Sequence, residues 1–174
     1  PKPTPRTWSP QSAASSPRSH QNVAGVLLTG KTEYRTPPIT VEARVTLPSR
    51  SNYNIIVASD TKQSGVHWEL FTMNGSGNLT VYTPGLQPDH TKSSAMICDG
   101  KPHNVAMTYE SRLIRLFVDG KLVTSQEVES AGTATVPGGF AIGKLVEGSI
   151  GSSGLPEWVR ISKGVRKSGS TTAH

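Results

Sequence analysis

Two neighbouring strands joined by a short turn constrain the fold of this chain more than any other feature. The segment runs from Asp99 to Val123 and reads DGKPHNVAMTYESRLIRLFVDGKLV. Apolar side chains alternate with the others over 105–110 and again over 114–119. Because successive side chains of a strand point to opposite faces of a sheet, both stretches are predicted to be strands with one buried face. Asp119-Gly120, ahead of another apolar run, indicates a further hairpin, since glycine tolerates the positive φ of a tight turn.

Short segments of the same kind recur along most of the chain. The clearest alternation covers 39–47, whose apolar side chains are predicted to face the core while 40, 42, 44 and 46 face solvent. Further strands are predicted at 23–28, 54–59, 66–73, 78–83, 124–128, 140–142 and 157–162. No stretch indicates a helix of three turns, and the 17 glycines and 13 prolines favour turns. The pattern predicts an all-β fold, a two-sheet antiparallel sandwich.

The composition divides the chain into three parts. Residues 1–22 are rich in proline, serine and basic groups and show almost no apolar periodicity. Such a segment cannot bury enough surface to offset its ordering entropy, so a linker is predicted there, and with it a further domain ahead of this one. The folded domain is predicted to cover 23–166, and a flexible tail is predicted over 167–174.

The net charge of +6 is concentrated at the two ends of the chain. Residues 1–36 carry +4, residues 163–174 carry +3, and the part between them carries −1. A nucleic-acid groove needs cations clustered on folded surface, with stacking aromatics, so no specific nucleic-acid partner is expected. No apolar run approaches the ~20 residues that span a bilayer, so no membrane insertion is expected. Cys98 is the single cysteine, which excludes an intrachain disulfide.

The order of the motifs resembles that of the laminin-G-like, concanavalin-A-like jelly rolls. The sequence motifs D-G-x-x-H-x-V-A-x-T-Y and R-L-F-V-D-G-K are similar to the core hairpins of that family. WELFTMNGSGNLTVYTP, GGFAIGK and GLPEWVRISKGVR resemble other strands of the family, so the likeness covers 23–166. It implies a jelly roll, a fold that hosts lectins, adhesion modules, pentraxin-like proteins and glycanases. The function that it implies is a non-catalytic binding or adhesion module of a larger secreted or surface protein, extracellular or periplasmic, with a glycan or protein ligand.

Two other functions stay open. A glycan hydrolase or lyase of the same superfamily needs paired carboxylates on one strand, and Glu127 and Glu129 alternate in that way. They stand beside Ser130-Ala131-Gly132, however, which favours a solvated strand end. The other alternative is a structural spacer or assembly domain, which would show large apolar patches and no pocket. The sequence favours a protein that is not an enzyme.

No cofactor is expected. The four loop acids Asp60, Asp89, Asp99 and Asp119 form no dense cluster in the sequence, whereas calcium takes six to eight oxygen ligands. The five histidines show no metal-ligand spacing. His103, at the start of a predicted strand, is expected to be structural, with a ring nitrogen bound to a turn carbonyl.

Four residues are predicted to contact a ligand: Trp158, Arg160, Tyr53 and Tyr82. If Val159 points inward, Trp158 and Arg160 lie side by side on the outer face of their strand. The competing interpretation is that Trp158 covers that face or a neighbouring loop. Tyr53 and Tyr82 are candidates because sugars are recognised by aromatic faces and a few polar groups.

Overall fold

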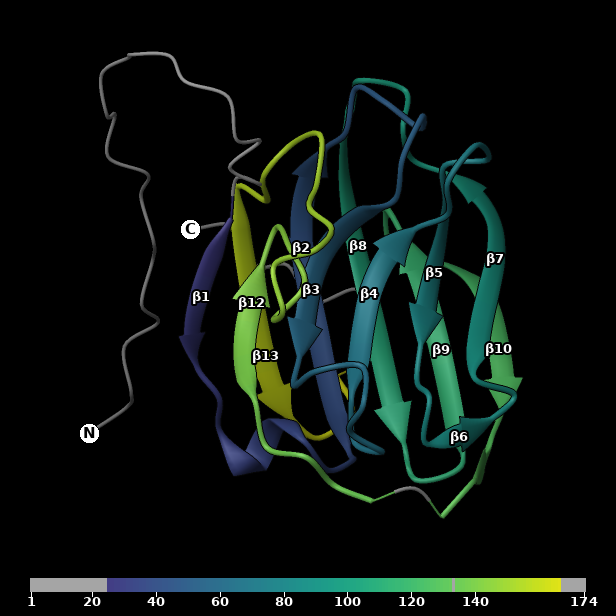
Figure 1. Cartoon of the computed structure of the whole chain (residues 1–174). Coiled ribbons are helices and arrows are strands. Elements are labelled where there is room, and N and C mark those ends of the chain that lie inside the picture. Colours follow the sequence, from purple (N-terminus) through teal and green to yellow (C-terminus); the bar gives the residue numbers. More distant parts are fainter. Residues whose placement is uncertain (1–24, 133, 167–174) are drawn as a thin grey trace, which may run out of the picture.

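The computed structural model describes residues 25–132 and 134–166, so the predicted linker over 1–22 and the tail over 167–174 lie outside the described part. These residues form two antiparallel sheets that face each other (Figure 1). The first sheet has six strands, in the order β1 (Val26–Thr29), β12 (Gly139–Ile142), β3 (Asn54–Ser59), β4 (Trp68–Thr72), β5 (Asn78–Tyr82) and β7 (His90–Met96). The second has five strands, in the order β10 (Lys121–Glu127), β9 (Leu113–Val118), β8 (Pro102–Glu110), β2 (Ile39–Thr46) and β13 (Trp158–Lys163). A small third pair joins β11 (Glu129–Ser130) to β6 (Leu86–Gln87), and the helical turn η1 (Thr32–Tyr34) precedes β2.

The predicted all-β, two-sheet antiparallel sandwich is therefore confirmed, and its core lies between the two large sheets. On β2 the alternation holds, because Ile39, Val41, Ala43 and Val45 are all 0% exposed. The opposite face of β2 departs from the prediction at Thr40, which is buried rather than solvated. The chain that follows β13 covers it: the Thr40 hydroxyl donates to the Gly164 carbonyl at 2.8 Å.

The sandwich has a second, smaller apolar cluster on the outer face of the six-stranded sheet. Ile55, Ala58 and Phe71 from β3 and β4 pack there with Leu145 from the loop after β12. Every residue of β3 and of β4 is consequently buried. These two central strands are covered on both faces, by the second sheet on one side and by a loop on the other.

The structure contains strands that the sequence pattern missed. β7 reads HTKSSAM, which has no apolar alternation, yet it pairs with β5 along the edge of the six-stranded sheet. Its inward positions are polar: Thr91 and Ser93 are buried, and the Ser93 hydroxyl donates to the Leu79 carbonyl at 2.8 Å. A pattern search based on apolar residues cannot detect a strand whose buried face consists of hydroxyl side chains.

His103 joins two turns at one end of the five-stranded sheet. Its Nδ1 lies 2.8 Å from Asp119 Oδ2 and its Nε2 lies 3.1 Å from Asp99 Oδ1. The expectation of a structural histidine bound to a turn carbonyl is corrected in this respect, because both partners are carboxylates. Asp119 has a φ of 49° in the turn before Gly120, a conformation that aspartate tolerates better than most residues.

The Arg35–Asp60 ion pair fixes the loop between β3 and β4. The Asp60 carboxylate is 0% exposed, accepts from Arg35 Nε at 2.9 Å and accepts from the Gly138 amide at 2.8 Å. Asp60 also has a φ of 61°, so the chain turns sharply after β3. One buried carboxylate thus joins η1, the β3–β4 loop and the approach to β12.

Stability is expected to depend on pH through His103. Burial of the ring opposes its charged form, but hydrogen bonds and charge attraction from Asp119 and Asp99 outweigh it and raise the pKa of His103. This contribution is complete below about pH 6.5 and is lost as the pH rises through the folded-state pKa. A backbone hydrogen bond from Lys101 lowers the pKa of Asp99, and hydrogen bonds outweigh burial in lowering that of Asp119, so the carboxylate contribution is lost as the pH falls below about 4. Urea denaturation at a series of pH values should show wild-type stability falling between about pH 6 and 8, and His103→Gln should reduce that slope. Equal slopes in both proteins would contradict the role of His103.

Loss of the Asp60 charge is expected to destabilise the fold strongly. Asp60→Asn keeps a residue that tolerates the positive φ but leaves the largely buried Arg35 guanidinium without its counter-ion, at a cost of about 3 kcal/mol. The matched control is Glu157→Gln, which breaks the exposed Arg44–Glu157 pair and should cost less than about 1 kcal/mol. Chemical denaturation measures both, and equal costs would show that the buried pair has no special role.

Candidate functional site

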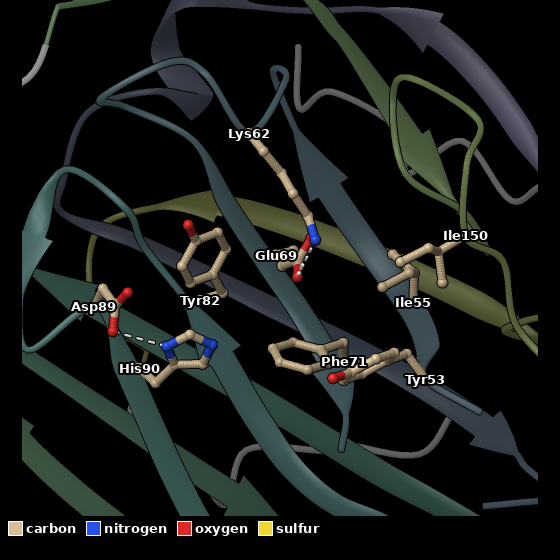
Figure 2. Close-up of a pocket in the computed structure, with 9 residues that line it drawn as sticks. All are labelled: Tyr53, Ile55, Lys62, Glu69, Phe71, Tyr82, Asp89, His90 and Ile150. Atoms are coloured by element: carbon tan, nitrogen blue, oxygen red, sulfur yellow. Dashed lines mark hydrogen bonds and ion pairs between the residues drawn. The ribbon is translucent and has the colours of Figure 1, made fainter. Parts of the chain in front are cut away.

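A hollow of about 270 Å³ lies on the outer face of the six-stranded sheet. Its lining is shown in Figure 2 and comes from four strands and the adjoining loops: Tyr53, Ile55, Lys62, Glu69, Phe71, Tyr82, Asp89, His90 and Ile150. This volume falls slightly below the range of about 300–1,000 Å³ that is usual for small-molecule pockets. The hollow therefore suits a small ligand or one unit of a larger ligand.

The strand register explains why these side chains meet. Glu69 of β4 is directly opposite Tyr82 of β5, and Tyr82 is directly opposite His90 of β7. In the neighbouring row Phe71 of β4 is opposite Ile55 of β3. Directly opposed residues project to the same face of a sheet, so two adjacent rows supply most of the lining.

Aromatic rings form one side of the hollow. The centroids of Tyr82 and His90 are 4.6 Å apart, those of Phe71 and His90 are 6.4 Å apart, and those of Tyr53 and Phe71 are 6.0 Å apart. Phe71 is only 2% exposed, whereas Tyr53 is 39% exposed. Phe71 is thus covered by its neighbours, whereas Tyr53 beside it is partly open to solvent (Figure 2).

Carboxylates and one lysine supply the polar groups. Glu69 is buried, and its Oε1 lies 3.6 Å from Lys62 Nζ. Asp89 Oδ1 lies 2.7 Å from His90 Nδ1. Burial, together with the negative charges of Asp89 and Glu69, raises the pKa of Tyr82, so its phenol stays protonated and can donate a hydrogen bond.

The four predicted ligand residues fall on two different sheets. Tyr53 and Tyr82 both line the hollow. Trp158 and Arg160 lie on β13, at the edge of the other sheet, opposite Arg44 and Glu42 respectively. Trp158 is 39% exposed, so this face of β13 is open to solvent there.

Arg160 is already engaged within the protein. Its guanidinium donates to both oxygens of Glu42, at 2.7 and 2.9 Å. The hydrogen bond that Arg160 donates to Glu42 raises the pKa of Arg160 despite partial burial. A ligand at this strand would compete with Glu42 for the guanidinium.

The acidic residues Glu127 and Glu129 stand on exposed chain, as predicted for a solvated strand end. Glu129 pairs with Arg112 at 2.8 Å, and both side chains are about three-quarters exposed. Val128 between them is buried in the main core. Glu42 lies on the five-stranded sheet and Glu69 on the six-stranded sheet, so these two acids do not converge.

Several residues of the hollow were not predicted from the sequence as a site. Lys62, Glu69, Phe71, Asp89 and His90 come together only through sheet pairing. One sequence signal was available: in WELFT the large apolar Phe71 stands two residues from Glu69, on the same face of the strand, which indicates that this face is partly covered. The position of His90 could not be inferred, because β7 itself was not predicted.

Metal-binding clusters and membrane-spanning helices are two further features that bear on function. Within 25–132 and 134–166 no three or more His, Cys, Asp or Glu side chains are grouped so as to hold a metal ion. Over the same described ranges, no helix has the length and apolar character needed to cross a membrane.

Comparison with solved structures shows the same fold in proteins of low sequence identity. The CBM40 of Ruminococcus gnavus IT-sialidase, bound to α2,3-sialyllactose, has a TM-score of 0.63 at 15% identity, covering 82% of this chain and 90% of its own. Domains LG4-5 of the mouse laminin α1 chain give 0.59 at 14% identity, covering 80% of this chain and 39% of that one, so this chain spans about two fifths of the laminin fragment. Galectin LEC-6 of Caenorhabditis elegans gives 0.51 at 9% identity, covering 82% of this chain and 92% of its own.

A search of proteins with curated functions found no match. The family profile described as the concanavalin A-like lectin/glucanases superfamily matches residues 20–168, which is most of the chain. The chain belongs to the concanavalin A-like lectin/glucanases superfamily, and its laminin-G-like resemblance is confirmed.

Proposed function

We propose that this domain is a non-catalytic glycan-binding module whose site is the hollow on the outer face of β3, β4, β5 and β7. One observation carries the proposal: adjacent strands bring the rings of Tyr53, Tyr82 and His90 together with the carboxylates of Glu69 and Asp89. Sugar rings present apolar C–H faces to aromatic rings and hydroxyl groups to carboxylates, so this combination suits a saccharide. Support also comes from the Ruminococcus gnavus CBM40, a protein of the same fold that is bound to sialyllactose.

The charges of the hollow favour a neutral sugar. Glu69 and Asp89 are two carboxylates in its lining, and Lys62, the one lysine there, is close to Glu69 at 3.6 Å. An acidic sugar would approach both carboxylates without an uncommitted cation to balance its charge. A neutral hydroxyl-rich saccharide can instead donate hydrogen bonds to both.

Binding is proposed to need no calcium. The four loop acids that could serve a rim site already have partners: Asp60 binds Arg35, Asp89 binds His90, and Asp99 and Asp119 both bind His103. A metal ion would have to displace each of these contacts. We also propose that the domain lies outside the cytoplasm, in a secreted or surface protein, because this location suits an exposed glycan partner. Other domains of that protein, or a protein ligand, are proposed to contact it as well.

A glycan hydrolase is the second candidate, and one observation favours it. Glu69 and Asp89 line the same hollow, and two carboxylates flanking a bond are the usual apparatus of glycoside hydrolysis. Their contacts argue for the binding module, since Asp89 is hydrogen-bonded to His90 and Glu69 is close to Lys62. Incubation with neutral oligosaccharides, followed by detection of new reducing ends, distinguishes the two candidates.

A glycan array that includes lactose and α2,3-sialyllactose, run with and without a calcium chelator, tests the proposal. Neutral glycans are expected to bind, sialylation to weaken binding, and the chelator to have no effect. Failure of every glycan to bind would leave the spacer or protein-binding alternatives.

Tyr53→Ala is expected to weaken binding of the best neutral glycan about tenfold, because it removes the most exposed ring of the hollow. Trp158→Ala is a matched control, since Trp158 is also 39% exposed but lies on the opposite sheet. Calorimetric titration measures both affinities. Loss of binding in Trp158→Ala with full binding in Tyr53→Ala would move the site to β13.

A further inference from the structure

A buried histidine and a buried glutamate face each other beneath the hollow. The His67 side chain is 0% exposed and that of Glu69 is 3% exposed. His67 Nδ1 lies 3.0 Å from the backbone carbonyl of Asp60. Because a carbonyl oxygen can only accept, Nδ1 must carry the hydrogen of this bond.

Whether the second ring nitrogen, Nε2, also carries a hydrogen therefore decides the net charge of the His67–Glu69 pair. His67 Nε2 lies 3.4 Å from Glu69 Oε2, and neither atom makes a hydrogen bond within the described residues. In the neutral ring fixed by Asp60, Nε2 would present a lone pair to a carboxylate oxygen, so two acceptors would face each other in a buried place. A proton held between the two atoms removes this conflict.

We propose that His67 is a positioning residue, which holds one proton against Glu69 and thereby fixes that carboxylate for the ligand. This inference rests on the proposed glycan-binding function. With Oε2 held by His67, the other oxygen, Oε1, is directed toward Lys62 at the hollow, where it can accept a hydrogen bond from a sugar hydroxyl. Loss of the proton releases Oε2 and lets the carboxylate turn away from that orientation.

Charged and titratable groups from every adjoining element face this pair. Lys62 reaches Glu69 from the loop before β4, and the ring of Tyr82 on β5 lies 5.8 Å from that of His67. His90, at the start of β7, stacks on the other side of Tyr82 and is held by Asp89. The Asp60 carboxylate is neutralised by Arg35, so the group that contacts His67 is the Asp60 carbonyl. None of these groups can replace the proton at Nε2.

Nitrogen NMR of the whole chain labelled at histidine tests the proton without any ligand. Both ring nitrogens of His67 should carry hydrogen, Nδ1 toward the Asp60 carbonyl and Nε2 toward Glu69. A ring that lacks the hydrogen on either nitrogen would overturn the inference. This result does not depend on whether a glycan binds, so it separates failure of the inference from failure of the proposed function.

Two substitutions then separate positioning from simple structural support. The substitution His67→Gln places an amide donor near the position that Nε2 occupies in the wild type, whereas His67→Asn places one near the position of Nδ1. With the neutral oligosaccharide that binds best in the array, His67→Gln should bind about as tightly as the wild type, because it restores a donor beside Glu69 Oε2. His67→Asn should bind about tenfold more weakly, because it leaves that oxygen without a donor. Equal binding by the two variants and the wild type would refute the role of His67.

Discussion

Burial of β3 and β4 on both faces is the constraint on which the rest of the structure depends. Their inner side chains fill the core of the sandwich, and their outer side chains need a second cover. Leu145 and Ile150, from the chain between β12 and β13, supply part of that cover. The part that they leave open is the hollow, so the candidate site is the place where the covering of the central strands is incomplete.

Most of the described carboxylates are paired with a basic side chain. Asp60, Asp99 and Asp119 stabilise turns and loops by binding Arg35 or His103, and Glu42 is held by Arg160. Glu69 differs from these residues because it is buried in a central strand and one of its oxygens makes no hydrogen bond within the described residues. A buried carboxylate without full compensation destabilises a fold, and Glu69 is therefore the acid whose position calls most for an explanation.

The fold could be predicted from the sequence to a large degree, and the site only in part. Alternation over 39–47 and 105–118 identified the buried faces, because a two-residue period is a local property of the chain. Tyr53 and Tyr82 were selected for their chemistry, and both line the hollow. Trp158 and Arg160 were selected on the same grounds and stay a prediction, although the inward packing of Val159 that they required is present. The polar strand β7 was missed, and with it the place of His90.

The sequence by itself determined most of the segments that become strands, and which side of those strands is apolar, since these follow from neighbouring residues. Apart from the hairpins joined by short turns, tertiary structure decided which strands lie next to one another. Sheet order β3-β4-β5-β7 and its register place Glu69, Tyr82 and His90 in one row, and a shift of one residue would turn any of them into the core. The proton between His67 and Glu69 likewise depends on the carbonyl of Asp60, seven residues earlier, whose position is fixed by an ion pair to Arg35. Contacts of this kind join distant parts of the chain, and no local pattern encodes them.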